Sequence, residues 1–367
     1  MASKTLADHL FHKACCFVLY FVAASVSFNG YYDKWHFGED GVSGEDDRFQ
    51  FEMMMDGTAF RPYIFRQMLP SAANFANRAV PKSLETWLYN SQAPGSGSRI
   101  EPIFDSPTAE NPIYFFRYLI VYGATFLFAL LAVCAMHLVC LALDLPPPAA
   151  VFAPVIVILL VPYIQSGGGY FYDYPELAFL ALAVWIALKF RWGWLIPVVA
   201  LGTWNKESFF FFIPTLYPLF RRRTSRLGAS LAVAALGLVS VAVYYPIRLH
   251  FAHNPGVPLE THWRDQLHYF LNWDYLMGTE KTYGVPMLKA FSLAPLALLA
   301  WTVVRAWPHL PPAIRRHAQI AAAINFPLYL LFCWPGELRD LSLLYVVFLL
   351  VLAVNLNQWI GSFAHSE

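Results

Sequence analysis

The segment LGTWNKESFFFFIP, residues 201–214, places three polar residues between two strongly apolar runs. Burying Asn205, Lys206 and Glu207 in hydrocarbon without partners would be costly. Read as one continuous helix, residues 192–220 would leave basic residues on both sides of a membrane, KFR before the helix and RRRTSR after it. Short basic loops stay in the cytoplasm, so the pattern favours a hairpin with the three polar residues at its tip.

Composition indicates the class of protein. Of the 367 residues, 58% are hydrophobic and only 13% are charged, whereas about a quarter are charged in soluble domains. Apolar runs long enough to cross a bilayer recur along the chain, which predicts an all-α polytopic membrane protein. The net charge of +1, without a basic patch interleaved with aromatic residues, gives no reason to propose a nucleic-acid partner.

Ten apolar runs are candidate membrane helices, and they predict about ten transmembrane spans. The runs cover approximately residues 11–29, 114–143, 150–165, 174–190, 192–204, 207–220, 227–248, 284–306, 317–334 and 341–360. The fifth and sixth runs are each shorter than a standard crossing, so we expect one short broken hairpin. The distribution of Lys and Arg places both termini in the cytoplasm.

The predicted organisation has three parts. An uncleaved first transmembrane helix (1–29) precedes a long extracytoplasmic loop (30–113) and a helical bundle (114–367). The bundle has outer loops at 166–173, 205–207, 249–283 and 335–340. Helical spacing of apolar residues predicts interfacial helices in two outer loops, one over Phe60, Tyr63, Ile64, Met68 and Leu69 and one over HWRDQLHYFLNWDYLM.

Charged residues of the first loop are the first candidates for a site. Asp56, Arg61 and Arg66 lie on the predicted interfacial helix. They could form a surface ion-pair set. They could equally place a carboxylate beside guanidinium groups that bind a phosphate through two hydrogen bonds.

Charged residues also stand at the start of predicted helices. Asp173 and Glu176 follow three glycines in QSGGGYFYDYPE, where carboxylates either cap the helix or hold a sugar hydroxyl or a divalent ion. Glu337 and Arg339 in WPGELRD either neutralise each other or join Lys206 and Glu207 in a charged outer vestibule. We expect Lys206 and Glu207 to serve function more than folding. The histidines show no zinc-site spacing, and any requirement for a divalent metal stays open.

The long acidic first outer loop with its interfacial helix resembles that of the GT-C glycosyltransferases. The segments DGTAFRPYIFRQMLP, YDYPELAF, WNKESFFFF and GELRD also look like segments of bacterial membrane proteins grouped with them. The resemblance implies an inner-membrane enzyme that takes a sugar from a polyprenyl-phosphate donor, among membrane lipids and with possible protein partners in an envelope assembly.

The resemblance also implies roles for the candidate residues. It assigns the catalytic base to a first-loop carboxylate, either Asp56 or Asp33, which accepts the acceptor's proton during inverting transfer. Basic residues would receive the lipid phosphate and further carboxylates would orient hydroxyl groups; these are Arg61, Arg66, Lys206 and Arg339, and Asp173, Glu176, Glu207 and Glu337. The alternatives are a transporter or flippase of a lipid-linked solute and a non-catalytic subunit of a membrane assembly.

Overall fold

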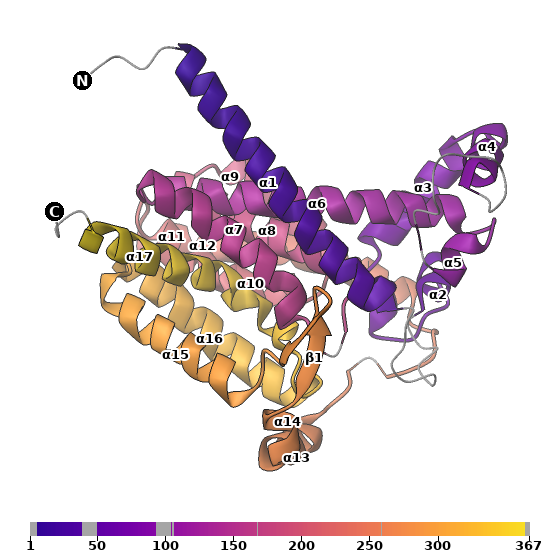
Figure 1. The fold of residues 1–367 in the computed structure, drawn as a ribbon. Coiled ribbons are helices and arrows are strands. Elements are labelled where there is room, and N and C mark those ends of the chain that lie inside the picture. Colours follow the sequence, from indigo (N-terminus) through magenta and orange to yellow (C-terminus); the bar gives the residue numbers. More distant parts are fainter. Residues whose placement is uncertain are drawn as a thin grey trace.

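A computed structural model describes residues 6–38, 50–92, 104, 106–166, 168–257 and 259–363. Most of these residues are helical, and the helices gather into one bundle from which the N-terminal end of α1 projects (Figure 1). The long elements are α1 (Leu6–Trp35), α6 (Phe115–Ala142), α7 (Pro147–Ile164), α8 (Asp173–Lys189), α9 (Trp192–Asn205), α12 (Arg226–His250), α15 (Leu293–Ala306), α16 (Pro312–Phe332) and α17 (Tyr345–Phe363).

Short elements connect the long helices. Before α6 these are η1 (His36–Gly38), α2 (Phe51–Asp56), η3 (Tyr63–Phe65), α3 (Met68–Ala79), α4 (Lys82–Gln92) and α5 (Pro107–Glu110). Later in the chain they are α10 (Phe209–Phe212), η4 (Ile213–Leu216), α11 (Tyr217–Phe220), α13 (Trp263–Leu271), α14 (Trp273–Leu276), β1 (Thr279–Thr282), β2 (Val285–Leu288), η5 (Trp307–His309) and η6 (Leu338–Leu344).

Five helices of the described residues are long and apolar enough to cross a membrane. They cover Leu10–Gly38, Phe115–Ala142, Pro147–Ile164, Arg226–His250 and Leu338–Gly361. The chain is therefore an α-helical membrane protein, but the predicted count of about ten spans is wrong by this measure.

The overestimate has a physical cause in the shorter apolar runs. Helix α8 has 17 residues and is buried along nearly its whole length, so its apolar side chains face other helices. Helix α9 has 14 residues, which corresponds to about 21 Å at 1.5 Å per residue, short of a bilayer core of about 30 Å. An apolar sequence alone does not distinguish a buried helix from one that contacts lipid.

The predicted broken hairpin is confirmed. Lys206 has an extended backbone (φ −155°, ψ 130°) and ends α9 before α10 begins. The second arm is divided into α10, η4 and α11. Trp192, the first residue of α9, stacks on Phe220, the last residue of α11, with ring centroids 5.2 Å apart. The two arms therefore return to the same level, with residues 206–208 at the tip.

The outer loops differ from the prediction in two places. Residues 279–288, partly assigned to a span, form the antiparallel hairpin β1–β2, in which Thr282 pairs with Val285 across a turn at Tyr283 and Gly284. Both turn residues have positive φ, 55° and 76°, as tight hairpins require. The first-loop helix is also broken. Helix α2 ends at Gly57 in the left-handed region, and α3 begins only at Met68. Its predicted lipid-facing residues Ile64 and Leu69 are buried in the protein.

Candidate functional site

A cavity of about 720 Å³ lies beside the tip of the hairpin. It is bounded by η3, the connection from α9 to α10, and parts of α12, α16 and η6. One part of its lining is charged and includes Arg66, Lys206, Glu207, Glu337, Arg339 and Asp340. Another part is apolar and includes Phe210, Phe211, Val241, Leu328, Phe332 and Leu343. The cavity therefore joins an ionic surface to a hydrocarbon-like surface.

Lys206 is the centre of the buried part of the ionic surface. Its Nζ donates to Oε2 of Glu176 at 2.8 Å and lies 3.7 Å from Oδ1 of Asp340. Burial lowers the pKa of Lys206, but the attraction of Glu176 and Asp340 outweighs burial and leaves that pKa above its ordinary value. The other Glu176 oxygen, Oε1, accepts from Ser208 at 2.8 Å and Ser342 at 2.7 Å. Lys206 is thus charged, and both oxygens of Glu176 have hydrogen-bond partners.

Two stacked tyrosines hold the two arginines. Tyr170 and Tyr172 precede α8, and their rings lie 5.2 Å apart with an interplanar angle of 6°. Arg66 lies over Tyr172 and Arg339 over Tyr170, each with its guanidinium carbon 4.6 Å from the ring centroid. Arg66 also donates to the Tyr172 hydroxyl. Because a guanidinium is attracted to the face of an aromatic ring, the stack fixes both cations.

Each arginine also has a carboxylate partner. Arg66 donates from Nη2 to Glu207 at 3.2 Å, and Arg339 donates from Nη2 to Glu337 at 2.8 Å. The second terminal nitrogen of Arg339, Nη1, is buried without a hydrogen bond and lies 3.7 Å from Oδ1 of Asp173, which also has none. Nη1 of Arg339 is therefore paired with Asp173 by charge without a hydrogen bond.

Carboxylates outnumber cations in this cluster. The ion pairs join three cations, Arg66, Lys206 and Arg339, to five carboxylates, Asp173, Glu176, Glu207, Glu337 and Asp340. Burial raises the pKa of Glu337 despite the opposing attraction of Arg339, and Asp340 reinforces the rise through charge and a hydrogen bond. A protonated Glu337 reduces the excess of negative charge and can give or take a proton near neutral pH.

The structure brings together seven of the ten residues that the sequence indicated. These are Arg66, Asp173, Glu176, Lys206, Glu207, Glu337 and Arg339. The helix-cap interpretation fits Asp173, which accepts from the Tyr170 amide at 2.9 Å at the start of α8. It does not fit Glu176, which binds the side chains around Lys206.

Three predicted residues lie apart from this cluster. Asp33 is exposed at the end of α1. Arg61 donates to the backbone oxygens of Ala252 and Gly256 at 2.8 and 2.6 Å. Asp56 accepts from Tyr114 and, at 3.1 Å, from Nη1 of Arg117. The expectation that one rigid helix would hold Asp56, Arg61 and Arg66 together is wrong, because the chain breaks at Gly57 and the three side chains bind different parts of the protein.

Asp340, in the same short motif as Glu337 and Arg339, also belongs to the cluster, and its charge identifies it in the sequence. Sequence reasoning did not select three further residues that complete the cluster. Ser208, Ser342 and Tyr172 carry no such signal, since isolated hydroxyl groups are common in membrane helices and loops. Only the folded arrangement directs Ser208 and Ser342 to the same oxygen of Glu176.

Comparisons with known proteins give no family. No protein-family model, curated protein or solved structure shows significant similarity to this chain. Within the part of the chain that the structure describes, no group of three His, Cys, Asp or Glu side chains is arranged to hold a metal ion. The geometry of the cavity is therefore the basis for assigning a function.

Proposed function

We propose that the cavity binds a lipid-linked substrate and that the chain is a GT-C-like glycosyltransferase. In this proposal it moves a sugar from a polyprenyl-phosphate donor to an acceptor, with inversion, at the extracytoplasmic face. The observation that carries the proposal is the amphipathic lining of the cavity. The lining combines buried Lys206 and Arg339 with the apolar rings of Phe210, Phe211 and Phe332. A ligand that carries both phosphate and isoprenoid chain matches both surfaces.

The positions of the carboxylates favour a particular base. The resemblance points to Asp33 or Asp56, but neither belongs to the cavity lining. Glu337 does, and burial raises its pKa toward the neutral range in which proton transfer is efficient. Glu337 would accept the proton of the acceptor hydroxyl, with Asp340 hydrogen-bonded beside it. The guanidinium of Arg339 and the ammonium of Lys206 would stabilise the charge that develops on the departing phosphate.

A transfer assay with a lipid-linked sugar tests the proposal. The protein in lipid nanodiscs is given a radiolabelled polyprenyl-phosphate sugar, and transfer and donor binding are measured separately. Loss of a general base removes about 10²–10⁴ in rate, so Glu337→Gln should lose transfer by that factor while it still binds donor. Asp56→Asn, which changes a carboxylate outside the cavity, is the matched control.

The same assay separates the alternatives. Full transfer by Glu337→Gln would overturn the assignment of the base. Binding of polyprenyl phosphate no tighter than binding of the uncharged polyprenol would overturn the proposed site. Binding without transfer, accompanied by movement of the lipid between leaflets, would favour the transporter.

A further inference from the structure

We propose that a second pocket, centred on Arg117, binds the phosphate group of an anionic membrane lipid. The pocket has a volume of about 420 Å³ and is formed by α3, α4 and the start of α6. Its lining shares no residue with the larger cavity. The inference goes beyond the proposed transfer reaction, because it concerns attachment to the membrane at a separate site.

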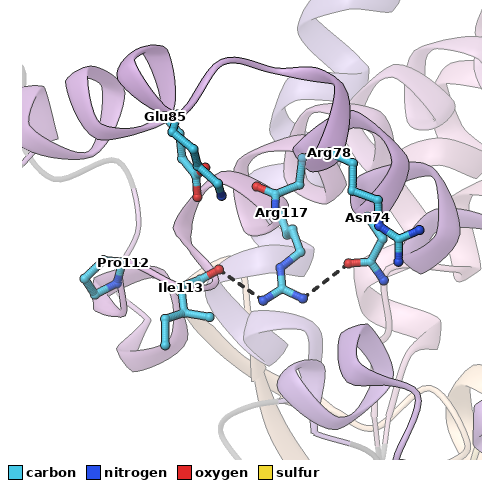
Figure 2. A pocket seen from close by; sticks show the side chains of 8 residues that line it. Asn74, Arg78, Glu85, Pro112, Ile113 and Arg117 are labelled. Atoms are coloured by element: carbon cyan, nitrogen blue, oxygen red, sulfur yellow. Dashed lines mark hydrogen bonds and ion pairs between the residues drawn. The ribbon is translucent and has the colours of Figure 1, made fainter.

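Hydrogen bonds hold Arg117 in place, and one nitrogen of its guanidinium group has no partner. It is a buried residue, 9% exposed, in the first turn of α6. Its Nη1 donates to Asn74 at 3.2 Å and Asp56 at 3.1 Å, and its Nη2 donates to the Ile113 carbonyl at 3.1 Å. Figure 2 shows the guanidinium between Asn74 and Ile113. The remaining donor, Nε, is buried without a partner. A buried donor without a partner is costly, and a phosphate oxygen would satisfy it.

The lining of the pocket is positively charged. It contains Arg78, Lys82 and Arg117 against a single carboxylate, Glu85. Lys82 is paired with Glu85 at 2.6 Å, and Arg78 is exposed at the end of α3. Arg117 is paired with Asp56, which lies outside the lining, so one positive charge, that of Arg78, remains in excess. The larger cavity is lined by four basic and four acidic side chains. Such a lining attracts a phosphate.

The pocket also offers an acceptor that suits a lipid headgroup. Oδ1 of Asn77 is buried without a hydrogen bond, so it can accept from a hydroxyl group next to the phosphate. The only hydroxyl groups of inorganic phosphate are its own protonated oxygens. The glycerol headgroup of phosphatidylglycerol carries two alcohol hydroxyl groups next to the phosphate.

Exposed apolar side chains surround the pocket. Phe75 on α3 is 74% exposed, Trp87 on α4 is 63% exposed, and Ile113 is 65% exposed. Amphipathic helices that carry aromatic residues on one face and cations nearby lie in the membrane interface. Lys and Arg there bind anionic headgroups. This arrangement favours a lipid over a soluble phosphate as the source of the phosphate group.

Lipid titrations of the full chain test the inference. The protein in zwitterionic nanodiscs is titrated with dioctanoyl phosphatidylglycerol, with dioctanoyl phosphatidylcholine and with inorganic phosphate, and binding is followed by Trp fluorescence and native mass spectrometry. We expect saturable binding of phosphatidylglycerol only. A surface cation contributes about fivefold in affinity, so Arg78→Gln and Lys82→Gln should each weaken binding about fivefold. Glu85→Gln should tighten it.

The controls make each outcome decisive. Arg222 and Arg223 are exposed cations in the connection from α11 to α12, and replacing both by Gln should leave binding unchanged. An equal loss in that control would show nonspecific charge attraction and overturn the site. Equal binding of inorganic phosphate would assign the pocket to a soluble phosphate and overturn the lipid proposal. The substituted residues lie outside the lining of the larger cavity, so a failure here is distinct from a failure of the proposed transferase.

Discussion

At the scale of residues, the contacts of Lys206 give it a structural role beside the functional role that we propose for it. A polar residue between apolar runs was expected to serve function more than folding. In the structure Lys206 is 4% exposed and its ammonium binds a carboxylate that is equally buried. Removing one member of a buried ion pair leaves an uncompensated charge and costs about 3–5 kcal/mol. The Lys206–Glu176 pair therefore holds α8, α9 and α10 together as well as bordering the cavity.

Substitution of Lys206 tests this structural role. Lys206→Met should lower the free energy of unfolding by about 3–5 kcal/mol, measured by thermal unfolding in detergent. The double variant Lys206→Met/Glu176→Gln also removes the nearer of the two carboxylates that Lys206 pairs with, so it should recover part of the loss. A single variant as stable as the parent would show that the pair contributes nothing to folding.

Glu337 should give the stability a characteristic dependence on pH. Burial raises its pKa from an ordinary value of 4.5 to about 8, against the effect of Arg339 and with that of Asp340. Between these values the folded state binds more protons than the unfolded state, so this contribution is complete below pH 4.5 and is lost as the pH rises through 8. Glu337→Gln removes this dependence, and its stability relative to the parent should rise between pH 5 and 8. A constant difference across that range would contradict the shifted pKa.

At the scale of elements, sequence patterns succeeded where a polar or basic residue interrupts an apolar run. The residues Asn205-Lys206-Glu207 marked the hairpin tip because apolar arms of this length do not tolerate them at depth. The patterns failed where tertiary contacts decide. Phe60 to Leu69 show helical spacing, yet Gly57 ends α2, and Pro62 lacks the amide that a continuous helix needs. The charged cluster could be anticipated residue by residue, but its pairings could not, because they join segments distant in the chain.

Close packing of the hairpin arms gives a test at this scale. A Cβ on Gly202 of α9 would lie 2.7 Å from the ring of Phe209, the first residue of α10, whereas a Cβ on Gly237 of α12 would meet nothing within 4 Å. Overpacking of this kind costs about 1–3 kcal/mol. Gly202→Ala should therefore lower the melting temperature, and Gly237→Ala should not. Equal melting temperatures for the two variants would show that the arms separate easily.

The sidedness of the elements is tested by labelling. Ser83 on α4 is exposed and belongs to the predicted outer loop, while Arg222 is exposed in a predicted cytoplasmic loop. In a background without the native cysteines, Ser83→Cys should react with an impermeant maleimide added to intact cells, and Arg222→Cys should react only after lysis. The reverse pattern would contradict the predicted topology.

At the scale of the whole molecule, five helices meet the requirements for crossing a bilayer. The charged cluster is formed by the start of α8, the connection from α9 to α10, the residue after η3 and the segment at the start of η6. Composition predicted the membrane class because 58% of the residues are hydrophobic and the share of charged residues, 13%, is well below that of soluble domains. It did not predict the number of crossings. Helix α8 uses its apolar residues to pack against α6 and α9, and a buried helix and a lipid-facing helix have similar compositions.

We propose that the amphipathic cavity binds a polyprenyl phosphate. The most direct measurement uses an analogue with a photoreactive diazirine in the first isoprenoid units, irradiated with the protein in nanodiscs and mapped by mass spectrometry. We predict labels on Phe210, Phe211, Leu328 or Phe332. These labels should disappear when excess polyprenyl phosphate competes, and the corresponding polyprenol analogue should label the same residues only weakly. Labels spread over the outer surfaces of α1 and α15, unaffected by competing polyprenyl phosphate, would contradict it.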